Sequence, residues 1–109
     1  MENTIDRLIK LIAQHLVFDE KNYPELKGAD EKKRLAFAIR HSALHFSKTA
    51  GKLSSISEDI DHGAEMDISD LKKQLIKSTV NTLRLAELLE MSEKDIACAV
   101  EEVCKEQPE

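Results

Sequence analysis

Residues 30–61 read as one long helix, and this segment limits the choice of fold more than any other part of the chain. Their apolar side chains recur three, four or seven residues apart, which is the spacing of a single helix face. Asp30 is a candidate N-cap, and His62-Gly63 ends the pattern. Gly51 is interpreted as marking a close contact with another helix or a kink in this one. The apolar stripe consists of Leu35, Ile39, Phe46, Ala50, Leu53 and Ile60.

Three shorter helices are predicted around the long one. Thr4 and Asp67 are candidate N-caps, and Ser92 with Asp95 resembles a capping box. Residues 17–29 contain proline and glycine among charged residues and are predicted to form a connecting loop. These three helices are expected over residues 4–16, 69–90 and 92–105.

The apolar content is mainly leucine, isoleucine and alanine, with only three glycines and two prolines. This composition favours helices over sheets. We therefore predict an all-α fold, with a single domain over residues 1–109 in which four helices form a bundle.

The helix over residues 69–90 has an apolar arc that covers about half of its surface, more than one neighbouring helix can bury. A second copy of the chain is expected to cover the excess, so we predict a homo-oligomer, a dimer or higher. In the last helix, Ile96, Val100 and Val103 are expected to face inward. The apolar arc contains Leu71, Leu75, Ile76, Leu83, Leu85, Ala86, Leu88 and Leu89, and the polar arc contains Lys73, Lys77, Asn81 and Arg84.

The charge and the hydropathy of the chain argue against two kinds of partner, nucleic acid and membrane, and the cysteines are expected to stay reduced. A formal net charge of −5 argues against binding to nucleic acid. No apolar run reaches the length of about 20 residues that a membrane span needs, and the first residues lack the features of a signal peptide, so a cytoplasmic location is expected. Cys98 and Cys104 point in different directions on one helix, and we expect reduced, buried thiols.

Two segments carry a resemblance to a known family. Residues 83–96 join an apolar helix end containing Ala86 to an acid-capped helix, and Ala50-Gly51-Lys52-Leu53 precedes them. Together they resemble MazG-like all-α nucleoside triphosphate pyrophosphohydrolases, over roughly residues 36–103. The resemblance implies a helical bundle in which carboxylates on two helices hold Mg²⁺ for the release of pyrophosphate.

The positions that correspond to those carboxylates hold no acid in this chain. They are Lys48, Thr49, Lys52, Gln74 and Lys77. A protonated lysine has no lone pair to offer a metal, and two like charges 4 Å apart repel by about 4 kcal/mol at an effective dielectric constant near 20. We therefore predict no catalytic residue, no metal and no cofactor. A binding or structural role is favoured over an enzymatic one.

Two interpretations of the lysines stay open. They lie on ordinary solvated helix faces, or they form an anion site that binds a phosphate-bearing small molecule such as a nucleotide. The candidate anion-binding residues are Lys48, Lys52, Lys73 and Lys77.

The histidines offer a different class of function. His41 and His45 lie four residues apart, as in a two-histidine metal site, but no further ligand lies within a turn, so surface histidines are favoured. His45-Phe46-Ser47-Lys48 is also similar to the active segment of histidine phosphotransfer domains. That alternative makes His45 a phospho-acceptor in a helical signalling domain, although Thr49 stands where those domains have glycine.

Overall fold

The computed structural model describes residues 3–106, which form four α-helices and contain no strand. This confirms the predicted all-α class, and each predicted helix boundary is correct to within two residues. A short 3₁₀ turn, η1 (Pro24–Leu26), lies in the connection between the first two helices. The helices are α1 (Thr4–His15), α2 (Glu31–Asp61), α3 (Ile68–Leu88) and α4 (Glu93–Glu106).

Side chains fix where three of the helices begin. Asp30 accepts a hydrogen bond from the backbone N–H of Lys33 at 2.8 Å, and Asp67 accepts one from Asp70 at 2.9 Å. Ser92 and Asp95 exchange hydrogen bonds at the start of α4, at 2.9 and 3.2 Å, which confirms the predicted capping box.

The predicted cap at Thr4 is wrong, because Thr4 is already the first residue of α1 and the N-cap residue is Asn3. The side chain of Asn3 makes no capping hydrogen bond. Instead, the Glu93 carboxylate accepts from the backbone N–H of Ile5 at 2.8 Å, and Asp6 accepts from the N–H of Glu93 at 2.7 Å. The N-terminal ends of α1 and α4 therefore cap each other.

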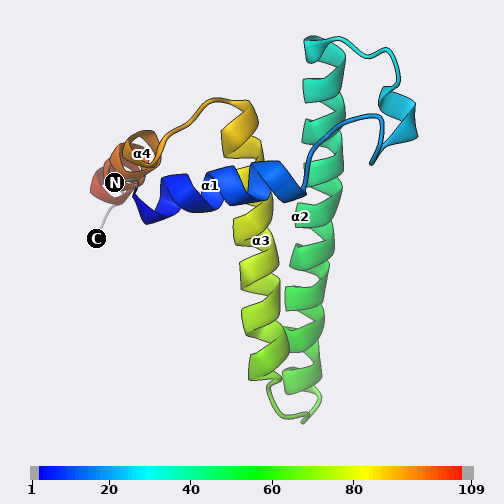
Figure 1. Cartoon of the computed structure of the whole chain (residues 1–109). Helices are drawn as coiled ribbons and strands as arrows, with labels where there is room; N and C mark the ends of the chain where they lie inside the picture. Colours follow the sequence, from blue (N-terminus) through cyan, green and yellow to red (C-terminus); the bar gives the residue numbers. More distant parts are fainter. Residues whose placement is uncertain (1–2, 107–109) are drawn as a thin grey trace.

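Helices α2 and α3 run antiparallel side by side, and α1 crosses α3 (Figure 1). Helix α4 lies beside the N-terminal end of α1, away from α2. No residue of α4 is buried. Within one chain, the expectation that Val100 and Val103 face inward is therefore wrong, since each is 55% exposed.

The apolar core lies where the α1–α2 connection packs against the hairpin of α2 and α3. Phe18, Leu26 and Ala38 are its buried members, and Tyr23 and Phe37 pack against them. The predicted loop is thus a structural segment, because it supplies two of the three buried core residues.

Much of the interface between α2 and α3 is polar. Asn81 is buried and donates a hydrogen bond to the backbone oxygen of Ser42 at 2.9 Å. Gln74 and Arg84 are buried as well. Two members of the polar arc of this helix, Asn81 and Arg84, are therefore buried against other elements. The two helices present polar faces to each other, and this leaves apolar side chains outside.

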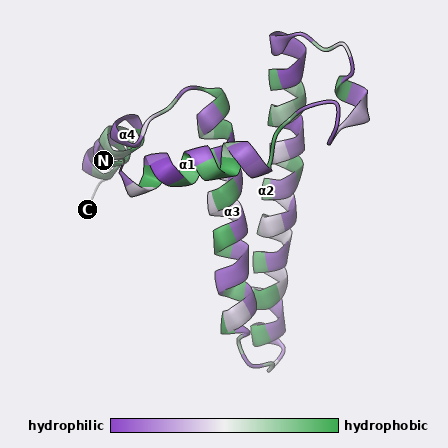
Figure 2. Cartoon of the chain, viewed as in Figure 1, coloured by the Kyte–Doolittle hydropathy of each residue, from purple (hydrophilic) through white to green (hydrophobic). Residues whose placement is uncertain are grey.

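Apolar side chains remain exposed on all four helices, including Leu75 (53%) and Ile76 (64%) on α3 (Figure 2). The accessible surface is 8590 Å², against about 6,100 Å² for a compact monomer of 12.3 kDa. The radius of gyration is 16.9 Å, whereas about 13 Å is usual at this length. A single chain therefore leaves an unusually large surface in contact with water.

The expectation of buried cysteines is also wrong, and one of the two interpretations of Gly51 is not met within the chain. Cys98 and Cys104 are exposed, because α4 packs so little of its surface. A Cβ atom at Gly51 would meet nothing within 4 Å, so this glycine does not mark a close helix contact within the chain. In the part of the chain described, no helix is both long and apolar enough to cross a membrane.

Candidate functional site

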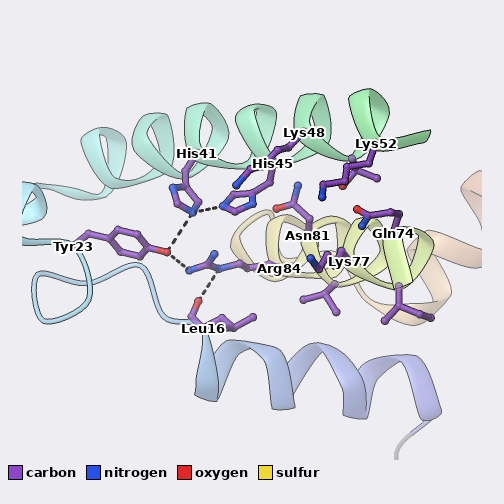
Figure 3. A pocket seen from close by; sticks show the side chains of 13 residues that line it. Leu16, Tyr23, His41, His45, Lys48, Lys52, Gln74, Lys77, Asn81 and Arg84 are labelled. Atoms are coloured by element: carbon purple, nitrogen blue, oxygen red, sulfur yellow. Dashed lines mark hydrogen bonds between the residues drawn. The ribbon is translucent and has the colours of Figure 1, made fainter. Parts of the chain in front are cut away.

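A cavity of about 570 Å³ lies between α2, α3 and the C-terminal end of α1 (Figure 3). Two stripes at helical spacing, one on α2 and one on α3, supply most of its polar lining and face each other across the cavity. Leu16, Ile76 and Val80 add apolar surface. The stripe on α2 consists of His41, His45, Lys48, Thr49 and Lys52, and that on α3 consists of Gln74, Lys77, Asn81 and Arg84.

The cavity brings together three of the four lysines singled out as anion-binding candidates. Lys48, Lys52 and Lys77 line it, whereas Lys73 is exposed and lies outside the lining. The five positions at which the MazG-like resemblance implied carboxylates, Lys48, Thr49, Lys52, Gln74 and Lys77, all line this one cavity.

The lining is strongly cationic although the chain as a whole is negative. It contains three lysines and one arginine but no aspartate or glutamate. Because like charges repel less when an anion sits between them, such a cavity favours a negatively charged ligand.

Arg84 is the most firmly held cation of the cavity, and it is only 9% exposed. Its Nε donates to the backbone oxygen of Leu16 at 2.7 Å, and its Nη2 donates to the Tyr23 hydroxyl at 3.0 Å. The guanidinium carbon lies 3.6 Å from the centre of the Phe18 ring, a cation–π contact. Among the described residues, no carboxylate forms an ion pair with Arg84. Its charge is therefore oriented but not neutralised.

His41 and His45 form a second polar pair beside Arg84. Their Nε2 atoms are 3.0 Å apart, and the Tyr23 hydroxyl lies 3.4 Å from Nε2 of His41. Only one of the two rings can donate in such a contact, so double protonation would break it. His45 is exposed, as expected for a surface histidine, but His41 is partly buried, so that expectation is wrong for His41.

The surroundings of His41 disfavour its protonated form. Burial, the neighbouring His45 and the charge of Arg84 lower the pKa of His41 below its usual 6.5, while Glu25 opposes them. His41 is thus mainly neutral at pH 7, and the fixed positive charge beside it belongs to Arg84. No group of three or more histidine, cysteine, aspartate or glutamate side chains converges as a metal-ligand set among residues 3–106.

Tyr23 and Arg84 were not among the site residues predicted from the sequence. Arg84 carried a usable signal, since it lies seven residues after Lys77 inside an otherwise apolar stretch from Leu83 to Ala86. Tyr23 carried none, because its place depends on how the α1–α2 connection folds back.

The fold and the site together define an all-α protein with a cationic cavity between two antiparallel helices. No protein-family model, no curated protein and no solved structure matches the chain. The function must therefore be inferred from the geometry of this cavity.

Proposed function

We propose that the protein binds a phosphate-bearing small molecule in the cavity between α2 and α3 and does not hydrolyse it with the help of a metal. The observation that carries this proposal is the convergence of four cationic side chains on a cavity lined by no acid. Arginine and lysine are the side chains that phosphate groups prefer in proteins.

The dimensions and the apolar walls of the cavity suit an organic phosphate. Its volume falls in the range of about 300–1,000 Å³ that is usual for small-molecule sites. Leu16, Ile76 and Val80 provide apolar surface for a sugar or a ring next to the cations. A nucleotide is therefore one member of the proposed ligand class.

The resemblance to MazG-like pyrophosphohydrolases supports this location but not their chemistry. In that family, acids at the matching positions hold Mg²⁺. Here Lys48, Lys52 and Lys77 supply positive charge directly, so the donor set does not fit a divalent cation. We infer that the lysines replace the metal as the partner of the phosphates.

Calorimetric titration with pyrophosphate in the presence of EDTA tests the proposal. We expect saturable binding that weakens as salt is added, because salt screens the charges of the exposed lysines. The double variant Lys48→Ala/Lys77→Ala should lose at least about tenfold in affinity. Lys72→Ala serves as the matched control, since this exposed lysine lies about 140° around α3 from Lys77. Absence of binding, or equal losses in the control, would contradict the proposal.

His45 as a phospho-acceptor is the second candidate function. It is favoured by the exposure of His45 and by the nearby Lys48, which lines the same cavity. Incubation with a phosphodonor such as phosphoramidate would test this candidate. A phosphohistidine that is absent from His45→Ala would support it and would displace the ligand-binding proposal.

We also infer that the working form contains two copies of the chain. The accessible surface exceeds that of a compact monomer by about 2,500 Å². Obligate dimers bury about 2,000–5,000 Å² in total, half of it from each chain, so two copies that each covered such an excess would form an interface at the upper end of this range. The exposed apolar residue Leu75, which lies outside the cavity lining, marks the face of α3 that this copy would cover.

A further inference from the structure

The cations of the cavity are spread along its length. Arg84, Tyr23 and His41 lie together at one end, which we call the arginine end (Figure 3). Lys52 lies with Gln74 at the opposite end, which we call the lysine end. Eleven residues separate His41 from Lys52 on α2, and this corresponds to about 16 Å along the helix axis.

The two ends hold their charge in different ways. Arg84 is buried and fixed by two hydrogen bonds and a ring contact, and no described protein group bonds to its Nη1. Lys48, Lys52 and Lys77 are exposed, and their long side chains adapt to what enters. The arginine end is thus a preformed site for one anionic group, and the lysines extend the positive charge away from it.

A single phosphate cannot contact both ends at once, because ten residues on α3, or about 15 Å of helix, separate Arg84 from Gln74. When anionic groups are covalently linked, binding of the first raises the effective concentration of the next. A chain of phosphates would engage the arginine and the lysines together.

We infer, on the basis of the proposed function, that the cavity has two anion subsites and therefore selects a chain of linked phosphates over a single phosphate. The shared chemistry is a row of consecutive phosphates. It can come from an inorganic polyphosphate or from the tail of a nucleoside polyphosphate.

Titration of the full-length protein with orthophosphate, pyrophosphate, tripolyphosphate and metal-free ATP tests this inference. Affinity should rise at least about a hundredfold from orthophosphate to tripolyphosphate. Lys52→Ala should weaken tripolyphosphate binding about tenfold and leave orthophosphate binding within about twofold, because a single phosphate sits at the arginine end. Lys72→Ala should change neither. If ATP binds as tightly as tripolyphosphate, the inorganic phosphate chain is sufficient for binding. If ATP binds more tightly, the nucleoside makes a contact of its own. Both outcomes support two subsites.

Two results separate this inference from the proposed function. If affinity does not change with chain length, or if Lys52→Ala weakens all the ligands by the same factor, the cavity has one subsite and the inference is overturned while the proposed function stands. If none of the phosphates binds, the proposed function fails as well. Lys52 is exposed, so its substitution leaves the folded chain intact for the comparison.

Discussion

The protonation of His41 makes the stability of the fold depend on pH, and the groups around its ring set the direction of this dependence. Tyr23 and His45 contact its ring, Arg84 repels its protonated form, and Glu25 attracts it. Because its pKa is lower in the folded chain than in the unfolded chain, the unfolded chain binds more protons as the pH falls below 6.5. The stability that this group contributes is therefore present above pH 6.5 and is lost as the pH falls toward the folded pKa.

Urea unfolding at pH 7.5 and pH 5.5 measures this effect. We expect the wild type to lose more stability on acidification than His41→Gln, which cannot take up the proton. The other three histidines are the same in both proteins, so the difference reports on His41. Identical pH dependence in the two proteins would show that His41 does not couple folding to pH.

Gly51 provides a second prediction at the residue scale. It is exposed in the middle of α2, and a Cβ atom there would meet nothing within 4 Å. Gly51→Ala should therefore raise the free energy of unfolding by about 1 kcal/mol through helix propensity. Gly63→Ala is the matched comparison and should destabilise, since Gly63 has a φ of +92°. Loss of stability in Gly51→Ala would place Gly51 against a neighbouring subunit.

At the scale of whole elements, the sequence predicted where helices lie better than which way they face. Helix boundaries depend on local signals such as the caps at Asp30 and Asp67, and these signals were present in the sequence. The inward face depends on packing between elements. The polar and the apolar arc of α3 share one helical period, so periodicity alone could not show that Arg84 is buried and Ile76 exposed.

Only part of the candidate site could be predicted from the sequence, because packing between elements also decides which residues meet there. Lys48, Lys52 and Lys77 could be named because the MazG-like resemblance implied a spaced set of site residues on two helices, and these lysines occupy three of those positions. Tyr23 could not, because a residue in an irregular connection has no period that fixes its direction.

The reciprocal caps of α1 and α4 lead to a prediction for α4 as a unit. Since α4 buries no residue, the hydrogen bonds between Asp6, Glu93 and Ile5 are main attachments of this helix. Asp6→Ala removes the acceptor of the Glu93 N–H and should cost about 1 kcal/mol. Hydrogen exchange over residues 93–106 should accelerate.

Asp30→Ala controls for general destabilisation, because it removes a cap from α2 without touching α4. Its exchange over residues 93–106 should stay close to that of the wild type. Unchanged protection of α4 in Asp6→Ala would mean that other contacts, such as those with a second copy, hold this helix.

At the scale of the whole molecule, the outward apolar faces predict a dimer. Light scattering at low micromolar concentration should give about twice the 12.3 kDa of one chain. Leu75→Glu places a charge on an exposed apolar position of α3 and should shift the protein toward the monomer, whereas Lys72→Ala should not. A well-folded wild-type species at the mass of a single chain would contradict the dimer.

The central claim is that the cavity between α2 and α3 is the binding site for a phosphate-bearing anion. Nuclear magnetic resonance of ¹⁵N-labelled protein during titration with pyrophosphate tests it most directly, because the side-chain nitrogens at issue are themselves observed. The account predicts saturable shifts of the His41 and His45 ring nitrogens and of the Arg84 Nε–H, with no shifts in α4. Shifts confined to other parts of the chain, or none at saturating pyrophosphate, would contradict it.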